Sequence, residues 1–391
     1  MKKPSIFMVV ECYYPIDRRV RCEAESMAPH YDVNVFALKK KGEKTFDEVN
    51  GVKVIRIPEF SLSWLGKGNF VFQYFYFTLA TLITFLITHP LKRYRAVHLN
   101  NPPDTLFVVG LIARILGARY VFDLHDLSGE LYMARFSRGK DAIYKALLFF
   151  ERLSCRFANI VITTNNSYGN LIIQRHNLPP DKVHIVRNDP ILNDFNPNKD
   201  NGRVKNTEMI FVGAINPQDG LDILLEVTKD LVYNRGLNDL ILRIVGDGDS
   251  LPEMKQLSVE MDLGKNVIFE GFVTDRKKLT GWIENSCLGV EPAPDNAVNG
   301  MSTFIKVAEY MAAGLPIVAF DLTETRYTTG GNAMLVKPGD LEGFADAIEK
   351  LLNDETLRQE LGATGSLRVK ENFNWQVAAD KLNGVYSEML N

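Results

Sequence analysis

The sequence predicts an α/β protein made of two doubly wound domains in tandem. Short, continuously apolar segments alternate with segments of helical periodicity, the alternation stops over residues 187–206, and it then starts again. Continuous apolar strands separated by helices are typical of parallel sheets covered on both faces. The length of 391 residues suits two or three domains of ordinary size.

The first half supplies the elements of one parallel sheet. Its candidate strands are SIFMVV, DVNVFAL, VKVIRI, AVHLN, YVFDLH, NIVITT and KVHIVR. Helical patterns lie between most of them, at Arg18–Met27, Thr105–Leu116, Ala142–Phe157 and Ser167–His176. We assign residues 1–190 to this N-terminal domain.

The second half repeats the design after a break. Residues 187–206 are rich in Asn, Asp, Pro and Gly, which predicts a linker, set at residues 191–207. Residues 208–373 then form the C-terminal domain, with strands MIFVG, LILRIVG, NVIFEGFV, CLGVEP, PIVAF and AMLV and a helix at Leu221–Tyr233. The apolar spacing of Trp375–Leu390 predicts a last helix, and residues 374–391 are expected to pack back on the first domain.

The segment Ser302–Phe320 is the most informative part of this second domain. Apolar residues recur at helical spacing, then a buried strand follows; the packing face consists of Phe304, Val307, Ala308 and Met311. Ser302 and Thr303 are predicted N-caps, and Gly314 is predicted to end the helix just before Pro316.

A second stripe on this helix consists of Lys306, Glu309 and Tyr310. One interpretation is a solvated polar face, as on most surface helices. The other is a ligand site, because a helix N-terminus and a cation suit a diphosphate and a carboxylate suits a ribose diol.

Composition excludes several classes of function. The net charge of −3 gives no sign of nucleic-acid binding. The four cysteines form no C-x-x-C pair or zinc-ligand spacing, which favours a reduced, cytoplasmic compartment. The apolar run after MKKP is too short for a signal peptide.

One apolar segment, Phe70–Thr88, is long enough to cross a bilayer. Strand patterns flank it on both sides, and Lys92, Arg93 and Arg95 follow it. We therefore expect a buried or interfacial helix, peripheral on the inner face of the cytoplasmic membrane, with a spanning helix as the alternative.

Glycine turns follow the strands of the second half, at FVG (211–213), IVGDGD (244–249) and GFV (271–273). Their order, FVG…GLDILLEV…IVGDGD…GFV…KVAEYMAAGLPIVA, resembles the second domain of glycosyltransferase family 4. The first-half segments PIDRRVRCEA and DLHDLSGELY resemble a branch that acts in bacterial surface-polysaccharide assembly. This resemblance implies the GT-B fold, with a cleft between two Rossmann-like domains, and a retaining transferase that uses nucleotide sugars.

The resemblance also implies roles for particular residues. Glu309 would hold the ribose hydroxyls, and the N–H groups of Ser302 and Thr303 would meet the diphosphate. The turn Gly271–Val273, through Gly271, Phe272 and Val273, would present its backbone to the base, with Gly213 and Gly246 at neighbouring strand ends. His125 would face the acceptor and the sugar; a capping or packing histidine is the alternative.

Three positions depart from the family pattern. Met301 stands where a first glutamate is common, and Ala214 and Asp219 stand where many members carry Arg and Lys. Lys306 is the expected substitute for the missing cations. Arg18, Arg19 and Arg21 could also reach an anionic substrate, although exposed arginines on a helix are commoner.

These features predict a hexosyltransferase that moves sugar from a UDP- or GDP-sugar, without a cofactor or metal, to a glycan or lipid-linked acceptor. The donor is expected on the C-terminal domain and the acceptor on the N-terminal domain. The alternatives are a sugar-nucleotide epimerase or phosphorylase on the same fold, and a non-catalytic nucleotide-sugar-binding subunit.

Overall fold

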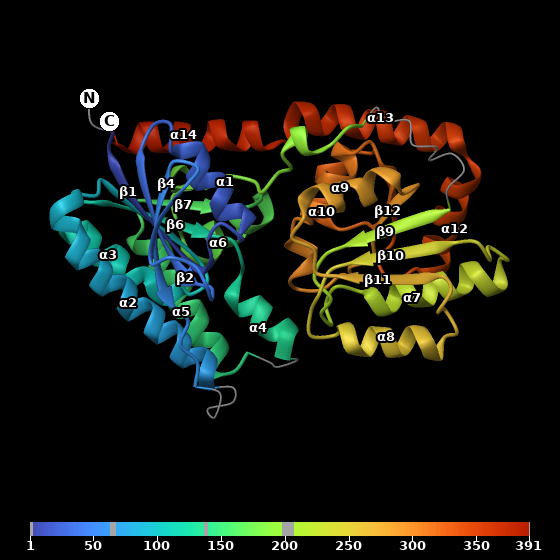
Figure 1. Cartoon of the computed structure of the whole chain (residues 1–391), viewed down its shortest axis with the longest axis horizontal. Coiled ribbons are helices and arrows are strands. Elements are labelled where there is room, and N and C mark those ends of the chain that lie inside the picture. The colour runs from blue at the N-terminus through green and yellow to red at the C-terminus, as the bar shows by residue number, and fades with distance from the viewer. Residues whose placement is uncertain (1–2, 63–67, 137–139, 198–206, 391) are drawn as a thin grey trace. The chain divides into compact units, whose positions relative to one another are not determined.

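The computed structural model describes residues 3–62, 68–136, 140–197 and 207–390, and its chain divides into two compact units. Unit 1 comprises Met1–Asn188 together with Ala378–Asn391, and unit 2 comprises Asp189–Val377 (Figure 1). Each unit is a sheet with helices packed against it, so the predicted α/β class is confirmed.

The sheet of unit 1 has the strand order β3-β4-β2-β1-β5-β6-β7-β8. Its strands are β1 (Ser5–Tyr13), β2 (Asp32–Lys39), β3 (Phe46–Val49), β4 (Val52–Pro58), β5 (Ala96–Asn100), β6 (Arg119–Leu124), β7 (Ile160–Thr163) and β8 (Val183–Ile185). All neighbours pair in parallel except β3, which runs antiparallel to β4. Sequence analysis missed β3 because it is a short edge strand that lacks an apolar run.

Seven helices belong to this part of the described chain, and several match their predicted bounds. They are α1 (Arg18–Met27), α2 (Gly68–Lys92), α3 (Phe107–Ile115), α4 (Ser128–Phe136), α5 (Ala142–Phe157), α6 (Asn166–His176) and α14 (Trp375–Leu390). α2, α3 and α5 lie together along the sheet in Figure 1. From Ala378 onward α14 clusters with unit 1, where the Tyr386 hydroxyl lies 2.8 Å from Nδ1 of His98 on β5.

The predicted linker is only partly irregular. The part of it that the structure describes contains a short 3₁₀ turn at Leu192–Asp194, and Phe195 is buried in the core of unit 2. The amide of Asn196 donates to Glu284 at 2.8 Å, so this stretch is fixed to unit 2. Residues 198–206 of the predicted linker lie outside the described residues.

The sheet of unit 2 is parallel throughout, in the order β11-β10-β9-β12-β13-β14. Its strands are β9 (Glu208–Val212), β10 (Ile241–Val245), β11 (Val267–Gly271), β12 (Leu288–Glu291), β13 (Ile317–Phe320) and β14 (Met334–Val336). Its helices are α7 (Leu221–Lys229), α8 (Leu251–Glu260), α9 (Arg276–Asn285), α10 (Ile305–Ala312), α11 (Thr323–Thr329), α12 (Leu341–Asn353) and α13 (Glu355–Asn372). A turn of π-helix at Asp230–Asn234 extends α7 to about the predicted end.

Each sheet reverses its winding direction at its first strand. In unit 1, β1 lies between β2 and β5; in unit 2, β9 lies between β10 and β12. At such a point the connections leave in opposite directions, and a crevice opens at the carboxyl ends of the two central strands. The carboxyl ends of β9 and β12 are therefore the first place to look for a ligand site in unit 2.

Candidate functional site

The three predicted glycine turns of unit 2 meet at one edge of the sheet. The amide of Gly213, after β9, donates to Val245 O at 3.0 Å, and the amide of Gly246, after β10, donates to Gly271 O at 3.0 Å. A Cβ on Gly246 would collide with the carbonyl of Gly213. The glycines thus allow three strand ends to approach closely.

Another glycine, Gly220, allows the loop after β9 to approach the loops on the other side of the switch point. Gly220 has a positive φ of 72°, and a Cβ there would collide with the carbonyl of Pro292, which follows β12. Asn299 adds a hydrogen bond from its side chain to Gln218 O at 2.7 Å. The loop after β9 is consequently held against the loops after β12.

Helix α10 starts later than predicted, and the N-caps assigned to Ser302 and Thr303 are wrong. The helix begins at Ile305, with Phe304 as its N-cap residue and no side-chain capping bond. Ser302 instead ends a 3₁₀ turn at Asn299–Met301, and its hydroxyl donates to Val298 O at 2.8 Å. The free amides at the start of α10 therefore lie further along the chain than expected.

The second stripe of α10 is not a solvated polar face. Tyr310 is fully buried, and its hydroxyl accepts a hydrogen bond from the amide of Val212 at 2.9 Å, at the end of β9. Glu309 is only 5% exposed. The polar side chains of this helix point into the unit, toward the strand ends.

Lys306 lies at the switch point and is paired with a glutamate that sequence analysis missed. Its ammonium lies 2.7 Å from Oε2 of Glu291, the last residue of β12, whose side chain is 1% exposed. The same ammonium lies 4.1 Å from the centroid of the Phe211 ring on β9. A Cβ on Gly213 would lie 2.9 Å from it, so the turn after β9 also borders Lys306.

Two acidic groups surround this one ammonium. Burial raises the pKa of Glu291, and Lys306 offsets part of that shift. Burial likewise raises the pKa of Asp219, again opposed by Lys306, although Asp219 also accepts a hydrogen bond from the amide of Asn216 at 2.9 Å. The aspartate that departs from the family pattern therefore helps to shape the loop after β9.

Glu309 takes part in a second ionic group, which includes a residue that sequence analysis also missed. Its Oε1 accepts from Nη2 of Arg276 at 2.6 Å, and Nε of Arg276 donates to Asp194 at 3.0 Å. The guanidinium lies 5.1 Å from the ring centroid of Phe195. Arg276 opens α9, directly after the turn that was assigned to the base, and therefore links that turn to Glu309.

The turn assigned to the base has the exposure that such a role needs. Gly271 ends β11 with a positive φ of 71°, and Phe272 is 66% exposed. Val273 packs against the core beneath. The sequence-based assignment of Gly271, Phe272 and Val273 is compatible with this geometry and stays a prediction.

His125 is buried in unit 1, in a polar network at the ends of β5 and β6. Its Nε2 lies 2.9 Å from Oδ1 of Asn100 and 3.5 Å from Oδ2 of Asp123. The same Asp123 oxygen lies 3.0 Å from Nε2 of His98. Burial lowers the pKa of His125, and the charge of Asp123 offsets part of this shift. The lowered pKa favours the neutral ring. Its role toward the sugar remains a prediction.

Glu23 on α1 completes this network. Burial, and then the charge of Asp123, raise the pKa of Glu23 well above its ordinary value. Ligand atoms of Glu23, Asp123 and His125 lie within 4.8 Å of one another, a spacing that could suit a metal ion. Two members of this group also have partners outside it: Asp123 pairs with His98, and His125 pairs with Asn100.

The arginines of α1 have structural partners. Asp17 caps the helix by accepting from the amide of Arg19, and Nη2 of Arg19 donates to Asp17 at 3.0 Å. Arg19 also lies 3.9 Å from Asp126, which follows His125. The guanidinium of Arg19 is therefore already engaged by carboxylates of unit 1.

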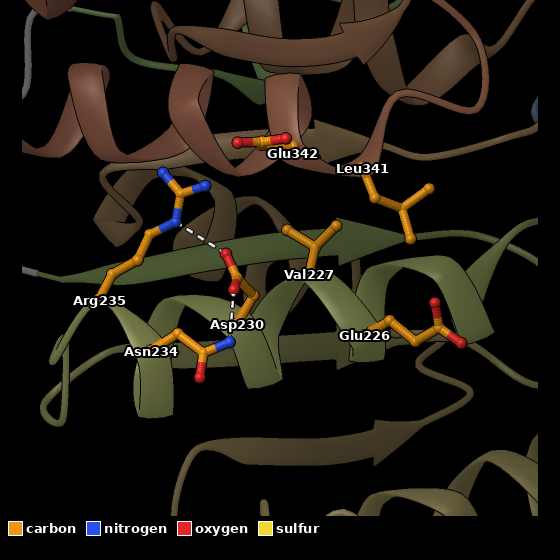
Figure 2. Close-up of a pocket in the computed structure, with 7 residues that line it drawn as sticks. All are labelled: Glu226, Val227, Asp230, Asn234, Arg235, Leu341 and Glu342. Atoms are coloured by element: carbon orange, nitrogen blue, oxygen red, sulfur yellow. Dashed lines mark hydrogen bonds and ion pairs between the residues drawn. The ribbon is translucent and has the colours of Figure 1, made fainter.

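A pocket of about 510 Å³ lies elsewhere in unit 2 (Figure 2). It is lined by Glu226, Val227, Asp230, Asn234, Arg235, Leu341 and Glu342, from α7, its π-helical extension and the start of α12. Arg235 is bound there to Asp230 at 2.7 Å and to Asp346 at 2.6 Å. None of its lining residues lies at the glycine turns, so it is separate from the candidate site.

Fold and site together define a class: a protein of two doubly wound units whose second unit places glycine turns, a partly buried lysine and a buried glutamate at its switch point. Two family models match the chain, "Glycosyl transferase 4-like domain" over residues 16–189 and "Glycosyl transferases group 1" over residues 206–354. The chain belongs to this family of glycosyltransferases, and its fold is GT-B.

Known proteins agree with this assignment. The chain is 24% identical to the α-D-kanosaminyltransferase of Streptomyces kanamyceticus over 310 residues, covering 75% of this chain and 76% of the relative. It is 21% identical over 311 residues to an Escherichia coli enzyme named UDP-Gal:α-D-GlcNAc-diphosphoundecaprenol α-1,3-galactosyltransferase, covering 76% of both. Its fold matches Anabaena HepE, solved in complex with UDP, with a TM-score of 0.74, 17% identity and 99% and 100% of the two chains covered.

Proposed function

We propose that this glycosyltransferase is a retaining hexosyltransferase that takes its sugar from a nucleoside-diphosphate sugar bound to unit 2. The observation that carries the proposal is the convergence of Lys306, Glu309 and the glycine turns at the carboxyl ends of β9–β12. A doubly wound sheet binds its ligands at that point. Retention of configuration is proposed from the family resemblance.

In this proposal the nucleoside is held between two neighbouring elements. The backbone of Gly271–Val273 contacts the base, and the carboxylate of Glu309 accepts hydrogen bonds from the ribose hydroxyls. Because Arg276 holds Oε1 of Glu309 at 2.6 Å, the carboxylate is oriented before the donor arrives. A carboxylate that is already held in its binding orientation loses less conformational entropy when the donor binds.

The diphosphate lies at the start of α10, beside Lys306. When the bond between the sugar and the diphosphate breaks, negative charge grows on the leaving oxygen. The Lys306 ammonium, held by Glu291 at 2.7 Å, and the free amides of α10 are placed to stabilise that charge. Lys306 thereby replaces the cations that Ala214 and Asp219 do not supply.

We propose that the reaction needs neither a cofactor nor a metal ion. Leaving-group charge is met in this proposal by an ammonium and by backbone amides, which supply the electrostatic stabilisation that a divalent ion gives in other transferases. Activity that survives a chelator would support this part, and full loss that Mg²⁺ restores would contradict it.

The proposed acceptor is a glycan or a lipid-linked glycan used in bacterial surface-polysaccharide biosynthesis. Relatives of the chain support this, since one is named for transfer to a diphosphoundecaprenol-linked sugar. Lipid-linked acceptors are confined to a membrane, so we also propose a peripheral location on the inner face of the cytoplasmic membrane.

The test starts with donor binding. A thermal-shift panel of UDP- and GDP-sugars should show one that raises the melting temperature, because tight binding stabilises the folded chain by mass action. Glu309→Gln should weaken that donor, since a charge-assisted hydrogen bond contributes about 1.5–3 kcal/mol. Donor affinity that Glu309→Gln leaves unchanged in calorimetry would contradict the ribose role.

Turnover distinguishes the enzyme from its rivals. Release of the nucleoside diphosphate together with a glycosylated acceptor is expected. Binding without turnover would favour a non-catalytic subunit, which the substitutions at Met301, Ala214 and Asp219 also allow. Conversion of the donor to its epimer, with no acceptor present, would favour an epimerase.

A further inference from the structure

Helix α2 exposes a row of large apolar side chains along its whole length. They recur at every fourth residue, and we call them the α2 row: Val71, Phe75, Leu79, Ile83, Ile87 and Leu91. Each is 45–81% exposed. Single exposed apolar residues are ordinary, but a contiguous row of this length marks an interaction surface.

The other side of α2 is part of the core of unit 1. Phe77, Thr81 and Phe85 are at most 1% exposed. Residues four apart advance about 40° around a helix, so this buried set lies opposite the middle of the α2 row, from Phe75 to Ile87, while Val71 and Leu91 lie toward its two flanks. Phe85 packs against Phe7 of β1 at 5.8 Å between ring centroids, and Phe77 packs against Phe36 of β2 at 5.6 Å.

This packing favours an interfacial helix over a spanning one. Val71–Lys92 is long and apolar enough to cross a membrane. To span a bilayer, however, α2 would have to leave the sheet and expose Phe77, Thr81 and Phe85. An orientation in the plane of the interface keeps these contacts and covers the α2 row alone.

The charged residues of α2 and α3 are all cationic, although Asp32 of β2 lies near Lys92 at the end of α2. Neither α2 nor α3 contains an Asp or Glu. Exposed arginines cluster where the two helices end: Arg93 and Arg95 follow α2, and Arg114 and Arg119 lie at the end of α3 and the start of β6. The amide of Arg119 donates to Arg95 O at 2.9 Å, which places two of these residues side by side.

Two more exposed apolar residues, Ile115 and Leu116, border this cationic cluster. An apolar row that ends in cations, without acidic residues on its helices, complements the acyl region and anionic headgroups of a bilayer. A second copy whose α2 ran parallel to the first would instead bring the same cations face to face, where they repel.

We propose that the α2 row and the cationic cluster (Arg93, Arg95, Arg114 and Arg119) form a surface that docks on an anionic bilayer, with α2 in the interface plane. Because α2 connects the carboxyl end of β4 to the amino end of β5, its first turns lie toward the strand ends where ligands bind. The bilayer would thus meet the ligand-binding edge of unit 1. The benefit to catalysis, though not the docking itself, rests on the proposed lipid-linked acceptor.

The experiment is cosedimentation of the full chain with phosphatidylcholine vesicles, with and without phosphatidylglycerol, in the absence of donor. Binding should need the anionic lipid and weaken with salt. Phe75→Ser/Leu79→Ser/Ile83→Ser should abolish it at every salt concentration. A matched control, Val259→Ser/Leu367→Ser, removes exposed apolar side chains from unit 2 and should bind normally.

The cationic cluster is tested by Arg93→Gln/Arg119→Gln. Each cation near the surface contributes about 1 kcal/mol, so this pair should lower the partition coefficient roughly 30-fold at low salt. Unchanged melting temperatures and donor-induced thermal shifts would show that the variants are folded. Because vesicle binding is measured without donor, the test of the docking surface remains valid even if no nucleotide sugar binds.

Three results would overturn the proposal. The first is wild-type vesicle binding by the triple variant of the α2 row. The second is resistance of the bound chain to alkaline carbonate, which would indicate a spanning helix. The third is a dimer in solution that becomes a monomer in the triple variant while vesicle binding is unchanged, which would make the row a protein interface.

Discussion

Replacing Lys306 by methionine should damage both the stability and the chemistry of this chain, and the structure allows the two effects to be separated. Sequence analysis gives Lys306 only a role toward the substrate, as the substitute for the missing cations. The structure adds an effect on stability, because the ammonium is paired at 2.7 Å with Glu291, whose side chain is 1% exposed. Methionine keeps most of the length of the lysine side chain but leaves that carboxylate without its cation.

The size of the stability loss follows from the burial of the pair. Removing one partner of a buried ion pair typically costs about 3–5 kcal/mol, because the remaining charge is desolvated and unpaired. Glu291 can relieve part of this cost by taking up a proton, since burial already raises its pKa. In Lys306→Met/Glu291→Gln the buried carboxylate is gone and only the partly exposed Asp219 loses its cation, so most of the lost stability should return.

The catalytic loss should persist in the double variant. Removing one electrostatic stabiliser of a transition state commonly lowers kcat by about 10²-fold or more. Urea denaturation measures the free energy of unfolding, and release of nucleoside diphosphate measures turnover. Lys350→Met, on the exposed surface of α12, controls for the substitution itself.

The double variant also supplies the refuting result. If it is as stable as the wild type and turns over donor at a near-normal rate, then Lys306 only neutralises Glu291. Attention would then move to Arg18 and Arg19, two of the three arginines that sequence analysis named.

Three further predictions concern other residues. Arg276→Gln should raise the Kd for the nucleoside diphosphate about tenfold or more in calorimetry, because Glu309 loses a charged hydrogen-bond partner; an unchanged Kd would contradict the positioning role. The pKa of Glu23 is raised, so the folded chain keeps a proton that the unfolded chain releases above the ordinary pKa of 4.5, and stability falls as pH rises from there. Glu23→Gln should flatten this trend and raise the melting temperature at pH values above neutral. A lower melting temperature in this variant would show that Glu23 is ionised. Gly246→Ala should destabilise unit 2 by roughly 1–3 kcal/mol or more in urea denaturation, because its Cβ collides with Gly213, whereas Gly264→Ala, which meets no atom within 4 Å, serves as the control.

The elements of this chain were predictable where local signals agree with one another. The helices at Arg18–Met27, Ala142–Phe157 and Trp375–Leu390 have the predicted bounds, because apolar periodicity continues up to residues that end it. Parallel pairing followed from the continuous apolar strands, since a strand buried on both faces needs no polar alternation. β3 was not predicted because this exposed edge strand has neither apolar periodicity nor a continuous apolar run.

Local signals failed where the tertiary structure used the same groups differently. Ser302 and Thr303 have good capping side chains, yet α10 begins at Ile305 because Ser302 is bound to the preceding 3₁₀ turn. The stripe of Lys306, Glu309 and Tyr310 could equally have been a solvated face, since periodicity records the side of a helix and not what covers it.

The sequence by itself therefore determined the fold class and the family, and it predicted the residue types of the proposed nucleotide-sugar site. Only the tertiary structure decided their partners. Lys306 pairs with Glu291, and Glu309 pairs with Arg276, which also binds Asp194. The physical reason is that each pair joins two different elements: Glu291 of β12 to Lys306 of α10, and Arg276 of α9 to Glu309 of α10. Ion pairs between elements leave no periodic trace, because each partner is selected by its position in space.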